Sequence, residues 1–273
     1  MADLRLFSYL PNPRLWKATI AARLCGVDLE IRGAKPRELA DWLWDFEARP
    51  LTEADRADDA GTARAARTGF AGRLHKTEAF LDAHPFGTVP AAFSPDGATG
   101  IFESNSIMRA VARLGAARCP LYGSDPYEAA RIDSFLDVSL VFARDSQIYL
   151  LALGREGVTA EFHASAAAAY EAWMSGLDRA LGPDRRWLVG AGVSLADICF
   201  VAELSLFSRE RSFAEALAAL DLPVIHGDDA EQRYPRAMAH YHRLCADPAF
   251  APDVGPYLEK MRAGLTPAPT SQS

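Results

Sequence analysis

Residues 84–114, HPFGTVPAAFSPDGATGIFESNSIMRAVARL, decide the fold, because they predict a strand, a turn, a second strand and a helix. The first strand is expected over residues 88–93. Ser-Pro-Asp-Gly at 94–97 is typical of a hairpin turn, since proline fixes φ and glycine tolerates positive φ. A second strand follows, and Glu103-Ser104 opens a helix whose apolar residues recur at helical spacing.

Two features of this stretch suggest a ligand. Pro90 removes a ladder hydrogen bond, so we expect it at a sheet edge, where the backbone of Val89 can pair with an extended peptide. Ser104 and the amides after it stand at a helix N-terminus, which favours a bound carboxylate. An extended peptide with a free carboxylate would satisfy both features, although a plain turn and a plain helix cap would explain the same residues.

The residues at the start of the chain predict a βαβ unit. Residues 4–9 alternate as a strand, residues 13–25 form a helix that Gly26 ends, and residues 29–32 form a second strand. A strand–helix–strand unit of about 30 residues predicts two parallel strands with a right-handed crossover.

Residues 34–80 do not fit this pattern. Residues 56–67 are nearly free of large apolar side chains and predict a solvated loop or a frayed helix. Ahead of them, an apolar face at helical spacing predicts a helix, with Trp44 off to one side. That face comprises Leu39, Trp42, Leu43 and Phe46. These aromatic residues could pack on a neighbouring domain, line a substrate pocket or meet a partner chain. Residues 77–83 return to helical character.

Beyond a linker at residues 115–125 the composition turns strongly helical. Helices are expected at residues 126–154, 159–181, 234–245 and 252–264. Ser194 is an N-cap with Asp197 three residues on, a capping box that opens an almost wholly apolar helix. That helix is expected to be the buried centre of an all-α domain.

Composition bounds the class of protein. The chain has 273 residues, a net charge of −7 and 49% hydrophobic residues, which is ordinary for a soluble globular protein. The mild acidity and the absence of a concentrated Lys/Arg run argue against nucleic-acid binding and against anionic membrane surfaces. Four scattered cysteines without a CxxC pattern indicate the reduced thiols of a cytoplasmic protein. No signal peptide or membrane span is predicted.

The sequence motifs do not support a metal site or a catalytic triad. His240 and His242 are two residues apart, so on a helix they point to different sides and cannot chelate together. The other histidines lack acid or cysteine partners at ligand spacing. The sequence contains no GxSxG, no phosphate-binding glycine loop and no zinc pattern, so no metal site is predicted.

The order βαβ, ββα and helical bundle resembles the glutathione transferase superfamily, whose fold is a thioredoxin-like α/β domain followed by an all-helical domain. Three motifs carry the resemblance: FGTVPA at 86–91 resembles the family's strand with its cis-proline, IFESNSI at 101–107 its glutamate-serine helix start, and LVGAGVSLADI at 188–198 its capped central helix. SYLPNPRLWKATIAA at 8–22 is most similar to the transferase-like domain of elongation factor 1 gamma.

The resemblance implies a domain organisation and a co-substrate. A thioredoxin-like, glutathione-binding domain is expected at residues 1–118, interrupted by an insertion around 34–76. An all-helical domain is expected at residues 124–264, followed by a disordered tail at 265–273. Glutathione is the expected co-substrate.

The resemblance also assigns glutathione contacts. In the family, the residue before the cis-proline pairs through its backbone with the cysteinyl part of glutathione, which maps onto Val89 and Pro90. The glutamate-serine pair holds the γ-glutamyl end, which maps onto Glu103 and Ser104. Glu103 can pair with the ammonium group, and Ser104 with its helix N-terminus can hold the carboxylate.

One contact departs from the family pattern. Thr88 stands where a lysine or glutamine is common, which puts a contact to the glycine carboxylate of glutathione in doubt. Arg14, Lys35 or a residue of the insertion are the expected substitutes.

The catalytic residue is expected near the end of the first strand or the start of the first helix. Family members stabilise the glutathione thiolate there with a hydroxyl or amide donor. The candidates are Ser8, Tyr9 and Asn12, with Asn12 first because it stands at the expected cap of the helix. With Arg14 as the family's helix-opening arginine, the usual slot holds Leu10, which cannot donate. The same three candidates could equally serve as a strand residue, a packing residue and a plain cap.

Three functions are consistent with these residues. In the first, glutathione thiolate attacks an electrophilic carbon of a small hydrophobic or aromatic substrate, with cleavage of lignin-type β-aryl ethers (β-etherase activity) as one form. The expected walls for that substrate are Phe135, Phe142, Tyr149 and Trp44. The second is a non-catalytic assembly module, as in the elongation-factor subunit. In the third, the chain is the less active partner of a heterodimer with a paralogue. A homodimer is the simpler expectation for the oligomeric state.

Overall fold

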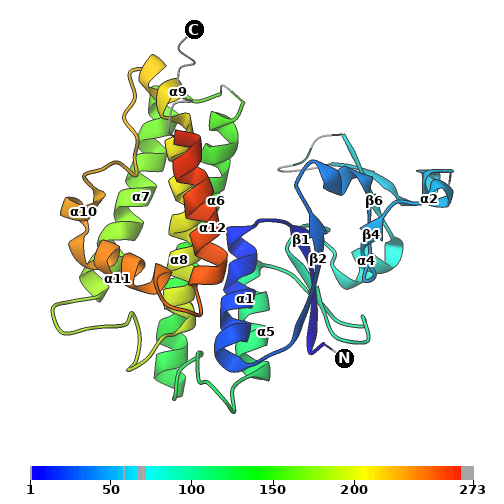
Figure 1. Cartoon of the computed structure of the whole chain (residues 1–273), viewed down its shortest axis with the longest axis horizontal. Coiled ribbons are helices and arrows are strands. Elements are labelled where there is room, and N and C mark those ends of the chain that lie inside the picture. The colour runs from blue at the N-terminus through cyan, green and yellow to red at the C-terminus, as the bar shows by residue number, and fades with distance from the viewer. Residues whose placement is uncertain (1, 58, 67–69, 71, 156, 266–273) are drawn as a thin grey trace, which may run out of the picture. The chain divides into compact units, whose positions relative to one another are not determined.

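The computed structural model describes residues 2–57, 59–66, 70, 72–155 and 157–265, and the chain divides into two compact units, Met1–Pro120 and Leu121–Ser273 (Figure 1). The first unit is mixed α/β and the second consists of helices, which confirms the predicted fold class. The predicted disordered tail lies outside the described residues, apart from Leu265, which ends the last helix.

A four-stranded mixed sheet forms the centre of the first unit. Its strands are β1 (Leu4–Tyr9), β2 (Leu29–Ala34), β7 (Ala91–Phe93) and β8 (Gly100–Ile101), in the order β2-β1-β7-β8. β1 and β2 are parallel, as the βαβ pattern predicts, with Leu6 opposite Ile31. β7 is antiparallel to both β1 and β8.

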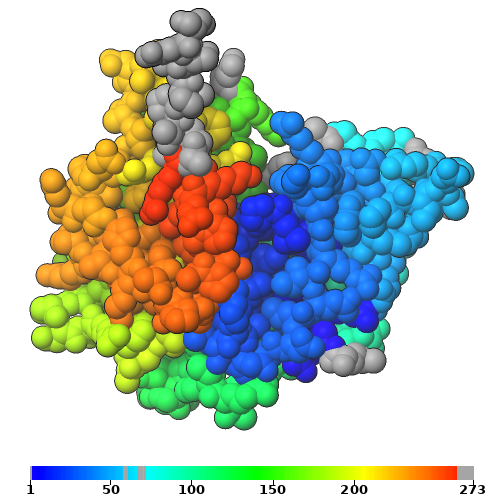
Figure 2. All heavy atoms as spheres, in the orientation of Figure 1, coloured from blue at the N-terminus to red at the C-terminus, as the bar shows by residue number. Residues whose placement is uncertain are grey.

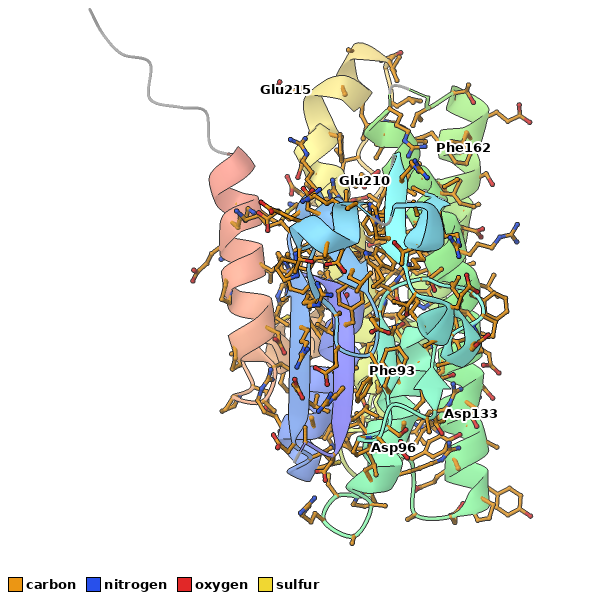
Figure 3. The ribbon with its side chains drawn as sticks, turned by 90° about the vertical axis from the view of Figure 1, so that its right-hand side faces the viewer. Phe93, Asp96, Asp133, Phe162, Glu210 and Glu215 are labelled. Atoms are coloured by element: carbon orange, nitrogen blue, oxygen red, sulfur yellow. The ribbon has the colours of Figure 1, made fainter. Side chains whose placement is uncertain are left out.

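The predicted hairpin joins β7 and β8. Gly97 donates its N–H to the carbonyl of Ser94 at 2.8 Å, and Asp96 belongs to the same turn (Figure 3). The first strand of the hairpin is shorter than the predicted 88–93. Ladder pairing starts only after Pro90, which has no N–H to contribute.

Two helices of the first unit pack against each other beside the sheet (Figure 1). They are α1 (Pro13–Cys25) and α5 (Ser104–Leu114). Pro13 begins α1, where its missing N–H costs nothing, and Gly26 ends the helix in the left-handed region at φ 64°. The pair brings the start of the chain to the segment that follows the hairpin.

The insertion folds as a second sheet, so the predicted helix at 39–46 is wrong. Its strands are β3 (Trp42–Trp44), β4 (Arg49–Pro50), β5 (Ala63–Ala65) and β6 (Arg73–Lys76), in the order β4-β3-β6-β5. Within residues 38–46, only the 3-10 turn η1 (Glu38–Asp41) is helical. The short run Trp42–Trp44 fits both the helical and the strand periodicity. Its β propensity prevails because β6 is available as a strand partner.

The region predicted as a solvated loop or frayed helix is also more ordered than expected. It contains the short helices α2 (Glu53–Ala57) and α3 (Asp59–Thr62), and then strand β5. Arg49 and Asp55 tie β4 to α2 by a two-bonded ion pair. The helix predicted at 77–83 is present as α4 (Glu78–Ala83). The described residues of the insertion appear in Figure 2 as atoms coloured from blue to cyan.

Trp44 attaches the second sheet to the first. Its ring is 1% exposed and contacts Phe7 of β1 and Phe80 of α4, with ring centroids 5.3 and 6.2 Å away. Its indole N–H donates to the carbonyl of Leu39 at 3.0 Å. The residue expected to lie off to one side of a helix is therefore the centre of an aromatic core shared by two sheets.

The second unit is built from helices. They are α6 (Pro126–Leu153), α7 (Ala160–Ala180), α8 (Leu195–Phe207), η2 (Ser208–Phe213), α9 (Ala214–Ala219), α10 (Ala230–Arg233), α11 (Pro235–Cys245) and α12 (Ala251–Leu265). The four long predicted helices correspond to α6, α7, α11 and α12. No helix was predicted for residues 208–233, but they contain one 3-10 helix and two short α-helices.

The capped central helix is present as predicted. Asp197 accepts from the N–H and the hydroxyl of Ser194 at 2.8 and 2.7 Å, which closes the capping box of α8. The same carboxylate accepts from His240 Nε2 on α11 at 2.7 Å. Almost every residue of α8 is buried, so α8 is the core of the helical unit.

A second buried polar group in this unit holds the segment after α9. Glu210 accepts from the backbone N–H groups of Ile225 and His226 at 3.0 and 2.9 Å, and from the Tyr149 hydroxyl at 2.8 Å (Figure 3). The ring of His226 is paired with the Tyr170 hydroxyl at 2.7 Å. Burial, followed by the nearby Arg211, lowers the pKa of His226 to about 4.

We expect His226 to make the fold acid-sensitive. An unfolded histidine titrates near pH ~6.5, so between there and pH ~4 the unfolded chain binds more protons than the folded chain. The contribution of His226 is therefore complete above pH ~6.5 and is lost as the pH falls, by roughly 1–3 kcal/mol in the free energy of unfolding. Urea unfolding of the wild type and of His226→Gln from pH 7 to 5 measures it. Equal slopes in the two proteins would contradict the assignment.

Candidate functional site

The candidate site lies in the first unit, at the segment that leads into β7. Val89 and Pro90 are joined by a cis peptide bond, which agrees with the cis-proline that the resemblance implies. The expectation that Pro90 lies at a sheet edge is wrong, because β7 has β1 on one side and β8 on the other. Pro90 stands instead just before the first residue of β7, where no ladder bond is lost, and the backbone of Val89 extends beyond the ladder.

Two buried side chains hold the loop that precedes this proline. The Gly87 carbonyl accepts from Lys76 Nζ at 2.6 Å, and its N–H donates to Nδ1 of His84 at 3.2 Å. Burial lowers the pKa of His84, which keeps the ring neutral and Nδ1 able to accept. Gly87 has φ 57°, and a Cβ atom there would lie 2.9 Å from a Leu81 methyl carbon, so only glycine suits this position. Lys76 belongs to the insertion, which therefore supports the site.

Glu103 has an unusual backbone conformation at the start of α5. Its φ is 65° and its ψ is 121°, and its exposed side chain makes no capping hydrogen bond. A non-glycine residue at positive φ carries strain and is often found at a functional site. The geometry presents the carboxylate to solvent beside the N-terminus of a helix.

Ser104 is the first helical residue of α5 rather than its cap, because Glu103 occupies the cap position. The Ser104 hydroxyl accepts from Lys17 Nζ at 3.3 Å, and the Asn105 side-chain carbonyl accepts from the same ammonium at 2.8 Å. Lys17 is 2% exposed and lies on α1. Since an ammonium can only donate, the Ser104 oxygen acts as acceptor toward Lys17, and its own hydrogen is left for another acceptor.

The catalytic candidates Ser8 and Asn12 are brought together. Asn12 caps α1 by accepting from the Arg14 N–H at 3.0 Å, and its Nδ2 donates to the Ser8 hydroxyl at 2.9 Å. Both side chains are buried, at 1% and 0% exposure. The amide nitrogen of Asn12 carries a second hydrogen, and Ser8 keeps its own hydroxyl hydrogen, so each residue retains one donor.

The remaining candidates of the first unit lie around this pair. Tyr9 is half-buried at the end of β1, and Arg14 is half-buried in the first turn of α1. Lys35 has a 79% exposed side chain that lies 3.8 Å from Glu38. Thr88 is exposed beside Val89.

The proposed substrate walls are mostly core residues. Trp44 belongs to the aromatic core of the first unit. In the second unit, Phe142 is stacked on Trp173 with ring centroids 4.2 Å apart, and Tyr149 is fully buried against Glu210. Trp44, Phe142 and Tyr149 are 1%, 3% and 0% exposed, so their predicted role as substrate walls is not supported. Phe135 differs, because it is half-buried and lines a surface pocket.

No cluster of three or more His, Cys, Asp or Glu side chains in the described part of the chain could hold a metal ion. No described helix is long and apolar enough to cross a membrane.

Lys17 and Lys76 were not predicted from the sequence. A signal for Lys17 was present, because it lies on the helix face of Ile20 and Ala21, both of which are fully buried. A charged residue on such a face needs a polar partner. The Lys76 contact depends on the second sheet, which the sequence did not indicate.

Comparison with solved structures settles the architecture. A glutathione transferase of Methylobacterium radiotolerans, in complex with glutathione sulfonate, superposes with a TM-score of 0.60 and 20% identity over 92% of this chain and 94% of that chain. The chain has the glutathione transferase fold. The resemblance drawn from its three motifs is thereby confirmed at the level of the fold.

Sequence relatives divide between two kinds of protein. A probable elongation factor 1-gamma 1 of Arabidopsis thaliana is 37% identical over 141 residues, which are 50% of this chain and 32% of that protein. The glutathione S-transferase-like protein FUS3 of Gibberella moniliformis is 25% identical over 243 residues, 88% of this chain and 86% of its own length. The chain thus matches only about a third of the elongation factor's length. No protein-family model matches the chain.

We expect Lys17→Met to lower the free energy of unfolding by about 1–3 kcal/mol, because Ser104 and Asn105 would lose a buried donor. Lys17→Met combined with Asn105→Leu should recover part of that loss, since removing both partners leaves fewer unpaired groups. Lys35→Met is the control, because its side chain is 79% exposed, and it should leave stability unchanged. Denaturant unfolding measures all three, and a Lys17 variant as stable as the control would contradict the contact.

Proposed function

We propose that the chain is a glutathione transferase whose first unit binds glutathione beside Pro90 and the N-terminus of α5. The observation that carries the proposal is the arrangement at α5, where Glu103 stands at positive φ with an exposed carboxylate and Ser104 is hydrogen-bonded to a buried ammonium. Four of the described features agree with glutathione: a backbone that extends past a cis-proline, a carboxylate, a hydroxyl donor and a helix N-terminus.

Each part of the γ-glutamyl group then has a partner of suitable chemistry. Glu103 pairs with the ammonium group of the tripeptide, as a charge-assisted hydrogen bond. Ser104 donates its free hydroxyl hydrogen to the carboxylate, and the first N–H groups of α5 add to that attraction. The backbone of Val89 pairs with the cysteinyl residue, as the second strand of a short ladder.

Asn12 is the proposed donor to sulfur. Glutathione supplies the thiol, and the reactive form of a thiol is its thiolate. The second Nδ2 hydrogen of Asn12 stabilises the negative sulfur, while its first hydrogen holds the Ser8 hydroxyl and its oxygen caps α1. The thiol proton passes to water. The sulfur then forms a bond to the electrophilic carbon, and the leaving group departs with the electron pair of its former bond.

The second substrate is proposed to be a small hydrophobic or aromatic electrophile. β-Aryl ethers of the lignin type are one candidate class, in which the leaving group is an aryloxide. Of the four predicted walls, Phe135 is the one whose ring borders a pocket of the helical unit rather than the core. Assays of glutathione consumption with chloro-aromatic, epoxide and β-aryl ether substrates would separate these classes.

A cytoplasmic dimer completes the proposal. All four cysteines, Cys25, Cys119, Cys199 and Cys245, are free thiols, which suits a reducing compartment. α6 exposes Val141 and Ile148, at 64% and 45%, which suits contact with a second chain, either identical or a paralogue.

The alternative is a glutathione transferase-like assembly module without activity. The 37% identity to a probable elongation factor 1-gamma over half of the chain favours it. In that case the site would be a remnant, and glutathione would neither stabilise the protein nor be consumed.

Reduced glutathione should raise the melting temperature of the full chain. A ligand that binds only the folded state adds about 2.7 kcal/mol of stability at 100 times its dissociation constant. Ser104→Ala is the matched control and should lose most of the shift, because its hydroxyl donor is gone. No shift of the wild type at millimolar glutathione would reject the transferase and favour the assembly module.

We expect Asn12→Asp to retain the cap of α1 but to lose turnover. Aspartate keeps the acceptor for the Arg14 N–H, while it lacks the amide donor and places a negative charge near the sulfur. The loss of a hydrogen bond to a charged group is about 1.5–3 kcal/mol, or roughly 10- to 150-fold in rate. Ser8→Ala is the comparison, with an expected loss of under about threefold. The reverse result would assign the sulfur contact to Ser8.

A further inference from the structure

Two of the four free cysteines lie beside each other in the first unit. Cys25 is the last residue of α1, and Cys119 lies in the segment after α5, 94 residues further along the chain. The Cys25 Sγ donates to the carbonyl of Cys119 at 3.6 Å. Burial, and after it the neighbouring Cys119 thiol, raises the pKa of Cys25 to about 12. The Cys119 thiol is therefore close enough to Cys25 to change its ionisation.

The segment after α5 packs closely on the end of α1 and keeps the two cysteines adjacent. A Cβ atom on Gly115 would lie 2.2 Å from the Cβ of Cys25 and 3.1 Å from its Sγ, so only glycine lets the two backbones approach this far. Arg118 donates its Nε–H to the Cys25 carbonyl at 2.7 Å. The N–H of Cys119 donates to the Gly115 carbonyl at 3.1 Å. The backbone near both sulfur atoms is thereby fixed.

The two thiols differ in how easily a reagent reaches them. Cys25 is 1% exposed, whereas Cys119 is half-buried. The thiolate is the reactive form of cysteine, and the attacking sulfur must also be accessible. An accessible thiol beside a buried one suits a reaction of two steps, in which Cys119 reacts first and Cys25 then attacks the product.

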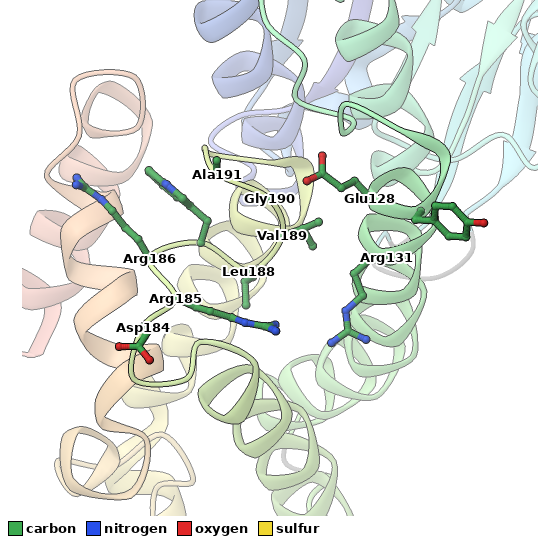
Figure 4. A pocket seen from close by; sticks show the side chains of 11 residues that line it. Glu128, Arg131, Asp184, Arg185, Arg186, Leu188, Val189, Gly190 and Ala191 are labelled. Atoms are coloured by element: carbon green, nitrogen blue, oxygen red, sulfur yellow. The ribbon is translucent and has the colours of Figure 1, made fainter.

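The surface hollow of the helical unit in Figure 4 offers no chemistry of this kind. It lies between the start of α6 and the loop that leads to α8, and its lining includes charges of both signs from Glu128, Arg131, Asp184 and Arg185. Among the described residues that line it there is no cysteine and no histidine.

We propose that Cys25 and Cys119 form a reversible intramolecular disulfide when the protein meets a low-molecular-weight disulfide such as glutathione disulfide. The inference goes beyond the proposed transferase function, because neither cysteine belongs to the proposed glutathione site. Where a compartment keeps thiols reduced, disulfides that form and break are typical of catalysis and redox sensing. The pair would thus record the oxidation state of the surrounding thiol pool.

The reaction is an exchange in two steps. The Cys119 thiolate attacks one sulfur of glutathione disulfide, and the first glutathione leaves with the electron pair of the broken S–S bond. Cys25 then loses its proton to water, and its sulfur attacks the Sγ of Cys119 and releases the second glutathione. The protein loses two electrons and two protons, and one glutathione disulfide becomes two glutathione molecules. Because burial keeps Cys25 protonated, we expect the second step to be the slower one.

The disulfide is expected to stabilise the first unit. It would close a loop from Cys25 to Cys119, which contains both β7 and β8, the insertion and α5. A cross-link over a long loop restricts the unfolded chain more than the folded one. We expect the urea midpoint of the oxidised protein to rise by roughly 1 M, and dithiothreitol to reverse the rise.

Mass spectrometry of the full chain tests the proposal. The reduced protein is incubated with excess glutathione disulfide, its remaining thiols are alkylated, and it is digested without reductant. We expect an intact mass lower by two hydrogen atoms before alkylation, and a pair of peptides joined through Cys25 and Cys119. Ser104→Ala should give the same result, so failure of the proposed glutathione site would not affect this test.

Matched variants separate the two steps. Cys119→Ser should lose both the linked peptides and the rise in urea midpoint. Cys25→Ala should stop after the first step and accumulate one glutathione on Cys119. Cys245→Ser is the control, because Cys245 is also half-buried and burial also raises its pKa to about 12, but no cysteine is among the groups that shift it. The control should form the disulfide as the wild type does.

Four results would overturn the proposal. They are the absence of linked peptides in the wild type, a single glutathione adduct that persists there at equilibrium, loss of two hydrogen atoms in Cys119→Ser, and a disulfide between two chains on a gel run without reductant. Circular dichroism confirms that the variants fold, and the peptide map of the wild type gives the decisive result without any substitution.

Discussion

The buried ammonium group of Lys17 is the contact on which the proposed glutathione site depends. It joins α1 to α5 through Asn105 and Ser104, at 2.8 and 3.3 Å. A buried charge is tolerated only where hydrogen bonds replace its lost hydration, so this contact constrains how the two helices pack. It also fixes the hydrogen-bonding role of the Ser104 hydroxyl, because the oxygen accepts from Lys17 and the hydrogen remains for a ligand. One residue thus links the packing of the unit to its chemistry.

The second sheet provides a comparable constraint on the other part of the site. Trp44 anchors it to the aromatic core around Phe7 and Phe80. Once the sheet is anchored, its last strand places Lys76 where the ammonium can donate to the Gly87 carbonyl. The loop that leads to Val89 is therefore held by the insertion as well as by its own His84. An insertion of this composition could have been a mere surface decoration, but its contacts make it part of the support of the site.

Local signals explain which predictions succeeded. Four features depend only on residues that are neighbours in the chain, so the sequence was enough to find them. They are the helix cap at Asn12, the helix end at Gly26, the Ser-Pro-Asp-Gly turn and the Ser194–Asp197 capping box. The strand at Trp42–Trp44 was missed because three apolar residues fit either period, and its partner β6 is some 30 residues away in the chain. Glu103 and Ser104 were found from a local motif. The positive φ of Glu103 and the buried partner of Ser104 were not, since both depend on tertiary packing.

Burial decides how the charges of the proposed glutathione site respond to salt. Lys17 is 2% exposed and acts through Ser104 and a helix N-terminus, whereas the Glu103 carboxylate is exposed. Salt screens exposed charges much more than buried ones, with a Debye length of about 8 Å at physiological ionic strength. Added salt should therefore weaken an ammonium group held by Glu103 well before it weakens a carboxylate held at Ser104. The α5 end of the proposed site thus suits a co-substrate that must be held in one orientation while its sulfur reacts.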